Sequence, residues 1–357
     1  MKARLWNAFS LALVGALLLS ACGGAAASPT AATSFKFALV TPGPRGDRSF
    51  VDASIRGADQ AIAELGVTGT IIEASGVADE EAAMRSALSL DLDIVLGLAI
   101  QPETLLALAE EFPDQKFGVP SDIFVETLPD NVAAFQINVH ESSYLVGVIA
   151  GSLSKTKTVG AVVGGDGPGL NQFYWAYKQG VLAVCPDCTV LVSYLNFEFN
   201  DPTLGKETAL GQYDQGADII FQVAGASGEG VISAAAERGL YAIGVDSNQD
   251  DIAPGSVIVS MIKRVDTSTF LLVKNTLEGN FKSGFSVIGM KDGATGLSWD
   301  DGSKTFAEQG PADMTGNLDA VMASVEEYRT KILDGSLAVC DALVDPEGTS
   351  AACAGLK

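Results

Sequence analysis

The stretch FKFALVTPGPRGDRSFVDASIRGADQAIAEL, residues 35–65, decides the fold class of this chain. Residues 35–40 are a short, mostly apolar run of the kind that forms a buried strand. Residues 50–65 then repeat apolar side chains at the spacing of an amphipathic helix. Ser49 and Asp52 form a candidate capping box at the start of that helix. A strand followed by a helix is the first half of a β-α-β unit.

The same alternation continues along the chain and restarts after residues 154–157. Apolar runs that predict further strands cover residues 69–72, 94–96, 116–119, 132–136, 158–163, 189–195, 218–223, 241–245, 257–261 and 286–289. Amphipathic stretches that predict helices cover residues 80–90, 102–111, 170–184, 202–215, 229–238, 265–277 and 318–333. Repeated β-α-β units build parallel sheets with helices on both faces. We therefore predict an α/β protein with two doubly wound lobes and a cleft between them.

The N-terminal segment has the pattern of an export signal. Lys2 and Arg4 give it a positive start, and residues 11–19 are an apolar core too short to span a bilayer comfortably. These features predict that residues 1–21 are a signal peptide. No later segment has 18 uninterrupted apolar residues, so we expect no other membrane crossing.

The end of this segment, LSAC at residues 19–22, resembles a bacterial lipobox. The resemblance implies that Cys22 becomes the first residue of the mature chain and carries lipid, which anchors the protein on the exported side of the cell membrane, periplasmic or extracellular. Residues 22–34 are then the lipidated cysteine and a tether of small residues. An ordinary signal peptide followed by a chance cysteine is the alternative.

Charge and length restrict the possible partners and the number of domains. Removal of residues 1–21 takes away two of the 22 basic residues and none of the 44 acidic ones, so the net charge becomes −24. Such a field repels nucleic acid, which we exclude as a partner. About 320 residues follow the tether, which exceeds the usual size of one core and predicts two domains. We expect a monomer.

Four cysteines remain after the anchor, and the chain has a single histidine. Cys185 and Cys188 form one close pair, and Cys340 and Cys353 form another in a C-terminal tail, residues 336–357. Outside the cytoplasm, two local disulfides are the simplest interpretation. A zinc site would require the two pairs to meet, and one histidine excludes a multi-histidine metal site. We therefore expect no metal and no cofactor.

Ligands of open α/β sheets bind beyond the carboxyl ends of the strands, which gives a short set of candidate loops. The loops that follow predicted strands contain residues 47–50, Gly97, Ser121 with Asp122, and residues 164–169, 225–228 and 246–249. Phe50 and Phe199 are aromatic residues on such loops, one in each half. Two aromatic rings that face each other across a cleft would hold a flat ring, and such stacking contributes roughly 1–3 kcal/mol per base.

The polar candidates are Asp246 and Lys263, each at the end of a predicted strand. The carboxylate of Asp246 could accept two hydrogen bonds from neighbouring sugar hydroxyls, and Lys263 could donate to the same hydroxyls or pair with Asp246. A helix cap or turn is the alternative role for Asp246. The turn GGDGPG, residues 164–169, lacks the pattern of a phosphate loop. The turn at residues 225–228 allows a close approach of the backbone before a helix.

Several stretches together, in this order and spacing, resemble the basic membrane protein family of lipoproteins. These are the purine-nucleoside-receptor type of substrate-binding proteins of ABC transporters, and the resemblance covers nearly all of residues 35–333. The stretches that carry it are DRSF (47–50), YLVGVIAG (144–151), VGAVVGG (159–165), GADIIF (216–221), AGASGEG (224–230), IGVDSNQ (243–249) and SMIKRVD (260–266).

The resemblance implies a type I periplasmic-binding-protein fold, in which three crossings join the lobes. We expect the crossings near residues 154–157, near Ser260 and near residues 280–283. The first lobe would then contain residues 35–155 with 259–281, and the second would contain residues 156–258 with 282–335.

The resemblance also implies roles for site residues. The two phenylalanines that stack on a purine map to Phe50 and Phe199, and the aspartate and lysine that hold the ribose map to Asp246 and Lys263. The family's glycine-rich turn maps to Gly225 through Gly228. Asp47, Ser121 and Asp122 complete the set of candidate ligand contacts.

Two departures from the family pattern fall on the side that would read the base. Val51 replaces the usual Asn after the first Phe, unless Asp52 substitutes for it. PSD at residues 120–122 leaves open whether Ser121 or Asp122 takes the place of a family aspartate. A nucleoside is thus better supported than any particular nucleoside.

The expected partners are a small-molecule ligand, an ABC permease and its ATPase. Riboflavin, a sugar or another aromatic metabolite is the alternative ligand. A sensory co-receptor is an alternative role. A nucleoside-cleaving enzyme is a third hypothesis, but the chain has no Asp-rich metal motif at a strand end and no Gly-x-Ser-x-Gly elbow. We predict no catalytic residues.

Overall fold

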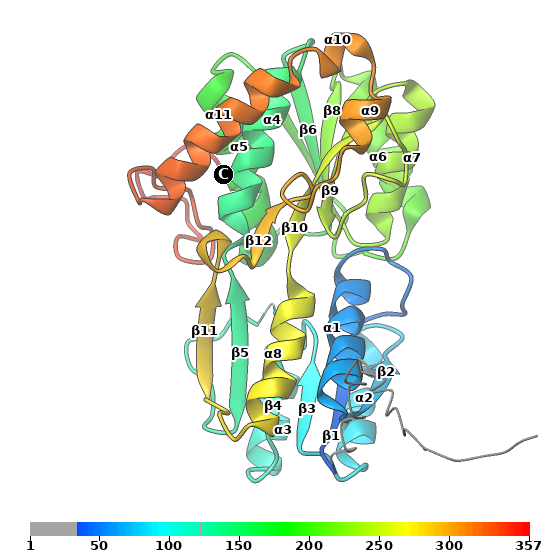
Figure 1. Cartoon of the computed structure of the whole chain (residues 1–357), viewed down its shortest axis with the longest axis vertical. Coiled ribbons are helices and arrows are strands. Elements are labelled where there is room, and N and C mark those ends of the chain that lie inside the picture. The colour runs from blue at the N-terminus through cyan, green and yellow to red at the C-terminus, as the bar shows by residue number, and fades with distance from the viewer. Residues whose placement is uncertain (1–33, 122) are drawn as a thin grey trace, which may run out of the picture. The chain divides into compact units, whose positions relative to one another are not determined.

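Two six-stranded sheets organise the chain in the computed structural model, which describes residues 34–121 and 123–357. The first sheet has the order β2-β1-β3-β4-β5-β11, and all its strands are parallel (Figure 1). Its strands are β1 (Lys36–Thr41), β2 (Thr68–Glu73), β3 (Ile94–Gly97), β4 (Phe117–Val119), β5 (Val132–Ile137) and β11 (Gly284–Ile288).

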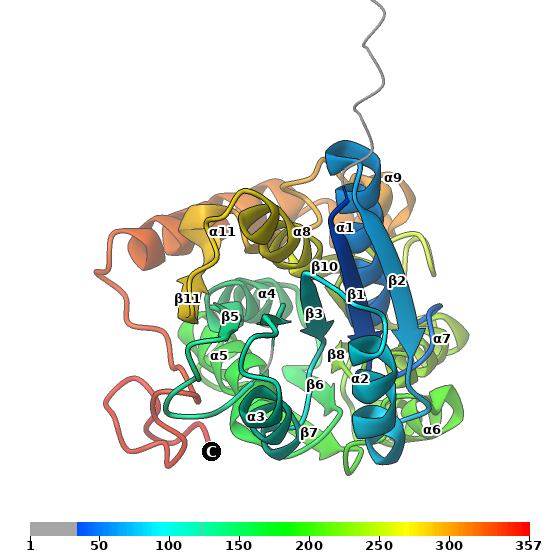
Figure 2. The same ribbon diagram turned by 90° about the horizontal axis from the view of Figure 1, so that it is seen from below.

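Helices cover both faces of this sheet, as the β-α-β pattern predicts. Figure 2 shows α1 and α8 on one face and α2 and α3 on the other. The helices are α1 (Phe50–Leu65), α2 (Glu80–Leu88), α3 (Pro102–Glu111) and α8 (Val265–Leu277), with a 3-10 turn η1 (Val77–Asp79) before α2. We call these strands and helices the first lobe.

The second sheet repeats the order of the first, β7-β6-β8-β9-β10-β12. Only β12 runs antiparallel to its neighbour, β10. The strands are β6 (Thr158–Val163), β7 (Thr189–Tyr194), β8 (Ile219–Val223), β9 (Tyr241–Asp246), β10 (Val257–Lys263) and β12 (Thr295–Leu297). In both sheets the strand order reverses at the second strand from one edge, which is where doubly wound folds open a crevice.

The helices of the second lobe also lie in two layers. Helices α4 (Val139–Leu153), α5 (Pro168–Val184) and α11 (Leu318–Leu333) pack on one side, while α6 (Pro202–Asp214) and α7 (Ser227–Arg238) pack on the other. Two short helices, α9 (Thr305–Gln309) and α10 (Ala312–Thr315), precede α11. The predicted fold class, two doubly wound lobes, is confirmed.

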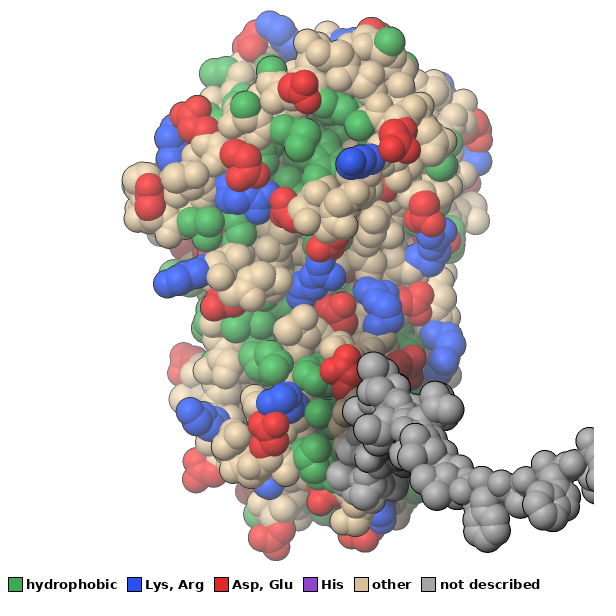
Figure 3. Space-filling model, viewed as in Figure 1, with side chains coloured by type: hydrophobic (Ala, Val, Ile, Leu, Met, Phe, Trp, Pro, Cys, Tyr) green, Lys and Arg blue, Asp and Glu red, His purple; other side chains and the backbone are tan. Residues whose placement is uncertain are grey.

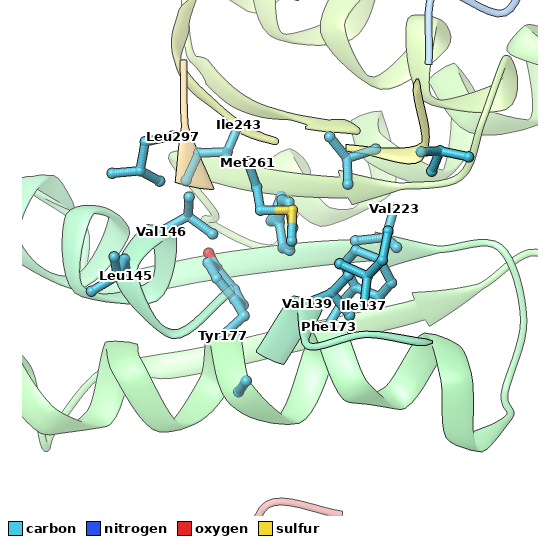
Figure 4. Packing of buried hydrophobic residues seen from close by; sticks show 14 of the residues in the cluster. Ile137, Val139, Leu145, Val146, Phe173, Tyr177, Val223, Ile243, Met261 and Leu297 are labelled. Atoms are coloured by element: carbon cyan, nitrogen blue, oxygen red, sulfur yellow. The ribbon is translucent and has the colours of Figure 1, made fainter. Parts of the chain in front are cut away.

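Contact between α4 and α5 is unusually close because of two glycines. A Cβ at Gly147 would overlap the carbonyl of Tyr177, and a Cβ at Gly180 would overlap the carbonyl of Tyr144. Figure 4 shows side chains of these helices, such as Val146 and Tyr177, opposite strand residues of the second sheet. The layer they form is fully buried and holds the second lobe together.

Three crossings join the lobes, and only the second lies close to its expected position, at Arg264 instead of near Ser260. The chain passes from β5 to α4 at Asn138, from β10 to α8 at Arg264, and from β11 to β12 through η2 (Met290–Asp292). Residues 139–155 therefore pack with the second lobe, and β11 joins the first sheet, in both cases against the expected boundaries.

The physical reason for the first difference is visible in α4 itself. Eleven of its fifteen residues are buried, because α5, α11, β10 and β12 surround it. A helix that is apolar on all sides carries no sequence signal for the sheet it covers. Strand β11 is half-exposed at the edge of the first sheet, so its apolar pattern is equally uninformative.

The C-terminal tail lies against α5 and contains one of two disulfides. Cys185 is bonded to Cys188, and Cys340 is bonded to Cys353. The backbone N–H of Cys340 donates to Oε1 of Gln179 on α5 at 2.8 Å. The tail thus braces the second lobe covalently and by hydrogen bonds, and the first lobe has no such brace among its described residues.

Two findings concern the membrane and metals. Within the described residues no helix is long and apolar enough to cross a membrane. The same residues contain no group of three or more His, Cys, Asp or Glu side chains placed to hold a metal ion. The predicted signal peptide and Cys22 lie outside the described residues.

Candidate functional site

Backbone strain is concentrated where the two lobes face each other. Among the described non-glycine residues, seven have a positive φ, and five of these follow a strand at its carboxyl end. Strained conformations of this kind cost about 1–3 kcal/mol each and cluster at functional sites. The five residues are Arg48, Ala99, Asn196, Phe197 and Asp246.

A buried polar contact joins the start of α1 to the loop after β9. The Ser49 hydroxyl donates to Oδ2 of Asp246 at 2.6 Å, and the Ser247 hydroxyl donates to the carbonyl of Ser49 at 3.2 Å. Nε2 of Gln249 donates to the carbonyl of Arg48 at 3.2 Å. We call the facing segments, residues 48–56 and 245–251, the polar clasp.

The edge of the polar clasp is more exposed than its centre. Nη2 of Arg48 donates to both carboxylate oxygens of Asp251, at 2.8 and 3.0 Å, and Nη2 of Arg56 donates to the Ser247 hydroxyl at 2.9 Å. Ser49 and Gln249 at the centre are 0% exposed. With these contacts made, the described residues form one compact unit.

Asp47 caps α1, which differs from the expected capping box. Its carboxylate accepts the backbone N–H groups of Ser49, Val51 and Asp52 at 2.8–3.0 Å. Burial raises the pKa of this carboxyl above its ordinary value, although the three N–H donors oppose the shift. The Ser49 side chain makes no cap hydrogen bond, because its hydroxyl is directed to the second lobe.

Asp246, Lys263 and Phe50 come together at the junction of the lobes. Nζ of Lys263 lies 4.8 Å from the ring centre of Phe50 in the first lobe and 5.6 Å from that of Phe173 in the second. Lys263 is 3% exposed and Asp246 is 7% exposed. A cation between two aromatic faces is stabilised by their quadrupoles. A carboxylate, an ammonium and an aromatic ring predicted from sequence are thus brought to one place.

A cavity of about 270 Å³ opens beside these residues, and a second of about 260 Å³ adjoins it. Asp246 and Lys263 line the first, together with Arg56 and Ser247. Arg264 lines both and forms an ion pair with Asp301. Figure 3 shows basic and acidic side chains close together on this face of the molecule. Charges of both signs line the first cavity, whereas Ile262, Met290 and Leu297 give the second a more apolar lining.

Three phenylalanine rings from other loops pack against glycines in and just after the turn between β6 and α5. The ring of Phe199 covers Gly164 and that of Phe197 covers Gly165, so a Cβ at either glycine would overlap the ring. Phe124, from the first lobe, lies against Gly169 in the same way. We call Phe124, Phe197 and Phe199 with residues 164–169 the aromatic edge. The glycines of this segment therefore leave room for phenylalanine rings, and the segment does not act as a phosphate loop.

The turn at residues 225–228 has two separate reasons for glycine. Gly225 has φ +55°, a left-handed conformation, and lies beside Phe199. Gly228 lies within α7, where a Cβ would overlap the side chain of Gln222. The first glycine thus shapes the loop next to the aromatic edge, and the second makes room for a buried glutamine.

Ser121 lies two residues beyond the end of β4 and has a buried hydroxyl. The residue is 1% exposed, and its Oγ has no hydrogen-bond partner among the described residues. Buried hydroxyls are ordinarily paired, so the absence of a partner here is unusual. Asp122 lies outside the described residues, and the choice between the two stays open.

Sequence reasoning missed the residues that join the lobes. Ser49 was assigned to a cap, and Phe124, whose ring reaches Gly169 of the second lobe, was not singled out. Phe197, which packs on Gly165 within the second lobe, was missed as well, and the two rings are 47% and 61% exposed on loops. Exposed aromatic residues on loops after strands are a usable signal. The contact from Ser49 to Asp246 spans 197 residues of sequence and left no local signal.

Two doubly wound lobes whose strand ends face each other are the arrangement of the type I periplasmic-binding-protein fold. A model of the Bmp family, described as PnrA-like substrate-binding proteins of ABC transporters, matches residues 35–320. The chain belongs to this family, as the sequence motifs predicted. Its class of function is therefore that of an ABC transporter substrate-binding protein.

Relatives and solved structures agree with this placement. A CD4+ T-cell-stimulating antigen of Listeria innocua is 29% identical in an alignment of 363 positions that covers 93% of this chain and 97% of the relative. Basic membrane protein D of Borreliella burgdorferi is 31% identical over 72% of this chain and 77% of that protein. An ABC transporter solute-binding protein of Aeropyrum pernix has a TM-score of 0.77 at 30% identity, covering 86% of this chain and 93% of that one.

Proposed function

We propose that this chain is the lipid-anchored receptor of an ABC importer and that it binds a nucleoside, in the first instance a purine nucleoside. The base lies between the rings of Phe50 and Phe199, and the ribose hydroxyls bond to Asp246 and Lys263. Closure of the lobes is the signal that the permease and its ATPase respond to. The protein acts as a monomer and has no catalytic role.

One observation carries the proposal. A carboxylate and an ammonium, each more than nine-tenths buried, lie beside an aromatic ring at the junction of the lobes. Vicinal hydroxyls are the chemistry that such a charged pair recognises, and a flat base is what the ring recognises. The left-handed backbone of Asp246, φ +64°, supports a binding role for this residue.

The part of the proposed site that would contact the edge of the base has weaker support. The unpaired Oγ of Ser121 supports a direct contact to a ring nitrogen or exocyclic group. Val51 in α1 is buried and apolar, so its side chain offers the base no hydrogen bond.

Relatives named as lipoproteins, such as one from Pyrococcus abyssi that is 30% identical over 91% of this chain, support the proposed anchor at Cys22.

A thermal-shift panel tests the proposal on the chain from Ala25 onward. The panel contains adenosine, guanosine, inosine, pyrimidine nucleosides, adenine, ribose, riboflavin and several sugars. A ligand at 100 times its Kd stabilises a protein by about 2.7 kcal/mol, which such an assay detects easily. We expect purine nucleosides to raise Tm while adenine and ribose do not. A response to riboflavin or a sugar alone would reject the nucleoside and keep the receptor.

Asp246→Ala tests the ribose contact directly. Loss of charge-assisted hydrogen bonds worth about 1.5–3 kcal/mol each should weaken ribonucleoside binding about 10- to 100-fold, measured by isothermal titration calorimetry. Free-base binding should change far less. Asp59→Ala, on the exposed side of α1, is the matched control. Equal losses for nucleoside and free base would remove Asp246 from the ribose role.

A further inference from the structure

Ser49 occupies an unusual position at the start of α1. It directly precedes Phe50 and is fully buried, and its hydroxyl donates across the lobes to Oδ2 of Asp246 at 2.6 Å. A serine at a helix start ordinarily caps that helix. Here Asp47 does so, and the Ser49 side chain makes no cap hydrogen bond. The hydroxyl is thus used for the other lobe alone.

The surrounding hydrogen bonds fix the approach of the two segments without this hydroxyl. Ser247 donates to the backbone carbonyl of Ser49, and Gln249 donates to that of Arg48. Gln249 is itself held by Nε2 of Gln222 at 2.6 Å and by the backbone N–H of Val245 at 3.0 Å. Both of these donors reach Oε1 of Gln249, and both belong to the second lobe. Removal of the Ser49 hydroxyl therefore removes its bond to Asp246 and a longer one of 3.5 Å to the carbonyl of Val245, and leaves the contacts to the backbone carbonyls of Ser49 and Arg48 in place.

From this geometry we propose that Ser49 is a positioning residue that couples lobe closure to ligand binding. A carboxylate has about four lone-pair sites, and the Ser49 hydroxyl uses one of those of Asp246. The bond exists only when the lobes meet, because Ser49 and Asp246 belong to different lobes. It orients the carboxylate at the moment of closure and slows reopening. This inference rests on the proposed role of Asp246 as a ligand contact.

This mechanism predicts how loss of the Ser49 hydroxyl changes the rates of ligand association and dissociation. A contact made only in the closed state stabilises the bound complex and adds little to the first encounter. Loss of the hydroxyl should therefore raise koff and leave kon nearly unchanged. A serine with a merely structural role in α1 would instead lower stability and reduce the fraction of active protein.

The experiment compares Ser49→Ala, Ser49→Thr and the control Ser86→Ala with the unmodified chain. Ser86 carries an exposed hydroxyl on α2 that donates to the carbonyl of Ala82, its one partner within residues 34–121 and 123–357. Stopped-flow fluorescence with inosine and with adenosine gives kon and koff. Hydrogen exchange of the ligand-free proteins reports opening of residues 245–251.

We expect Ser49→Ala to raise koff about tenfold with kon within about threefold, because the lost bond is charge-assisted. Exchange at residues 245–251 should become faster. Ser49→Thr retains the hydroxyl and should restore most of koff, and Ser86→Ala should match the unmodified chain. An unchanged koff together with unchanged exchange in Ser49→Ala would overturn the proposal. Failure of the proposed function is visible separately, because the unmodified chain would then bind neither nucleoside.

Discussion

The polar clasp and the aromatic edge both join the lobes, yet they are built from opposite chemistry. The clasp is buried at its centre, where Ser49 and Gln249 are 0% exposed and hydrogen bonds link the two segments. At the aromatic edge, Phe124 and Phe197 are 47% and 61% exposed and lie against bare glycine backbone. The contacts of the polar clasp are directional and buried, whereas those of the aromatic edge are apolar and exposed to solvent.

This difference indicates a division of labour. A hydrogen bond weakens steeply when its angle departs from linearity, so the clasp forms only in one relative position of the lobes. Apolar contact has no such angular demand and contributes in proportion to the area removed from water. We infer that the clasp sets where the lobes stop and that the aromatic edge provides a compliant surface for a flat ring.

The largest expected effect breaks the aromatic edge from inside. Gly164→Ala places a Cβ where the ring of Phe199 lies, so the ring must move away from the proposed base site. Binding of a purine nucleoside should weaken about 10- to 30-fold by calorimetry, in line with the loss of one stacking partner worth roughly 1–3 kcal/mol.

Gly211→Ala is the matched control for that variant. A Cβ at Gly211, in α6, has nothing within 4 Å, and alanine is the better helix former. It should bind normally and unfold at the same or a slightly higher temperature. Unchanged binding in Gly164→Ala would show that the position of Phe199 is unimportant to the ligand.

A middle-sized effect separates the two contacts. Phe124→Ala removes the apolar contact from the first lobe to Gly169 and leaves the polar clasp intact. Because the ring is half-exposed, koff for inosine should rise only about three- to fivefold. Val344→Ala, at an 80% exposed position in the tail, is the control. A loss as large as that of Ser49→Ala would contradict the division of labour.

The smallest effect concerns the rim of the clasp. Asp251→Asn removes the charge that pairs with Arg48, whose side chain is 45% exposed against 69% for Asp251. Exposed ion pairs contribute at most about 1 kcal/mol and are screened by salt. Affinity should fall less than about threefold at low salt, and the difference from the unmodified chain should vanish at 1 M salt. A loss above tenfold would place this pair at the centre of the clasp.

Local patterns were sufficient for most of the fold. The run at residues 35–40 and the helix at residues 50–65 lie within a residue or so of β1 and α1. The spacing of Cys185 and Cys188 indicated a local disulfide, which the structure contains. These features succeed because strand, helix and short-range pairing depend on neighbours in sequence.

The site was predictable only in part. Asp246, Lys263 and Phe50 were found because each lies at or beyond the carboxyl end of a strand, and strands of a parallel sheet end at one edge. The capping box failed because Asp47 competes for the same N–H groups from three residues upstream of the helix. The lobe to which α4 belongs could not be read, since that helix is buried on most of its sides.

The sequence by itself determined the alternation of strands and helices, the doubly wound class, the family and the loops that carry the charged and aromatic candidates. Only the tertiary structure decided where the chain crosses between lobes, which glycines seat phenylalanine rings, and that Ser49 faces Asp246. The reason is that periodicity and turn chemistry are local, whereas a hydrogen bond between residues 197 positions apart exists only after both lobes have folded and met.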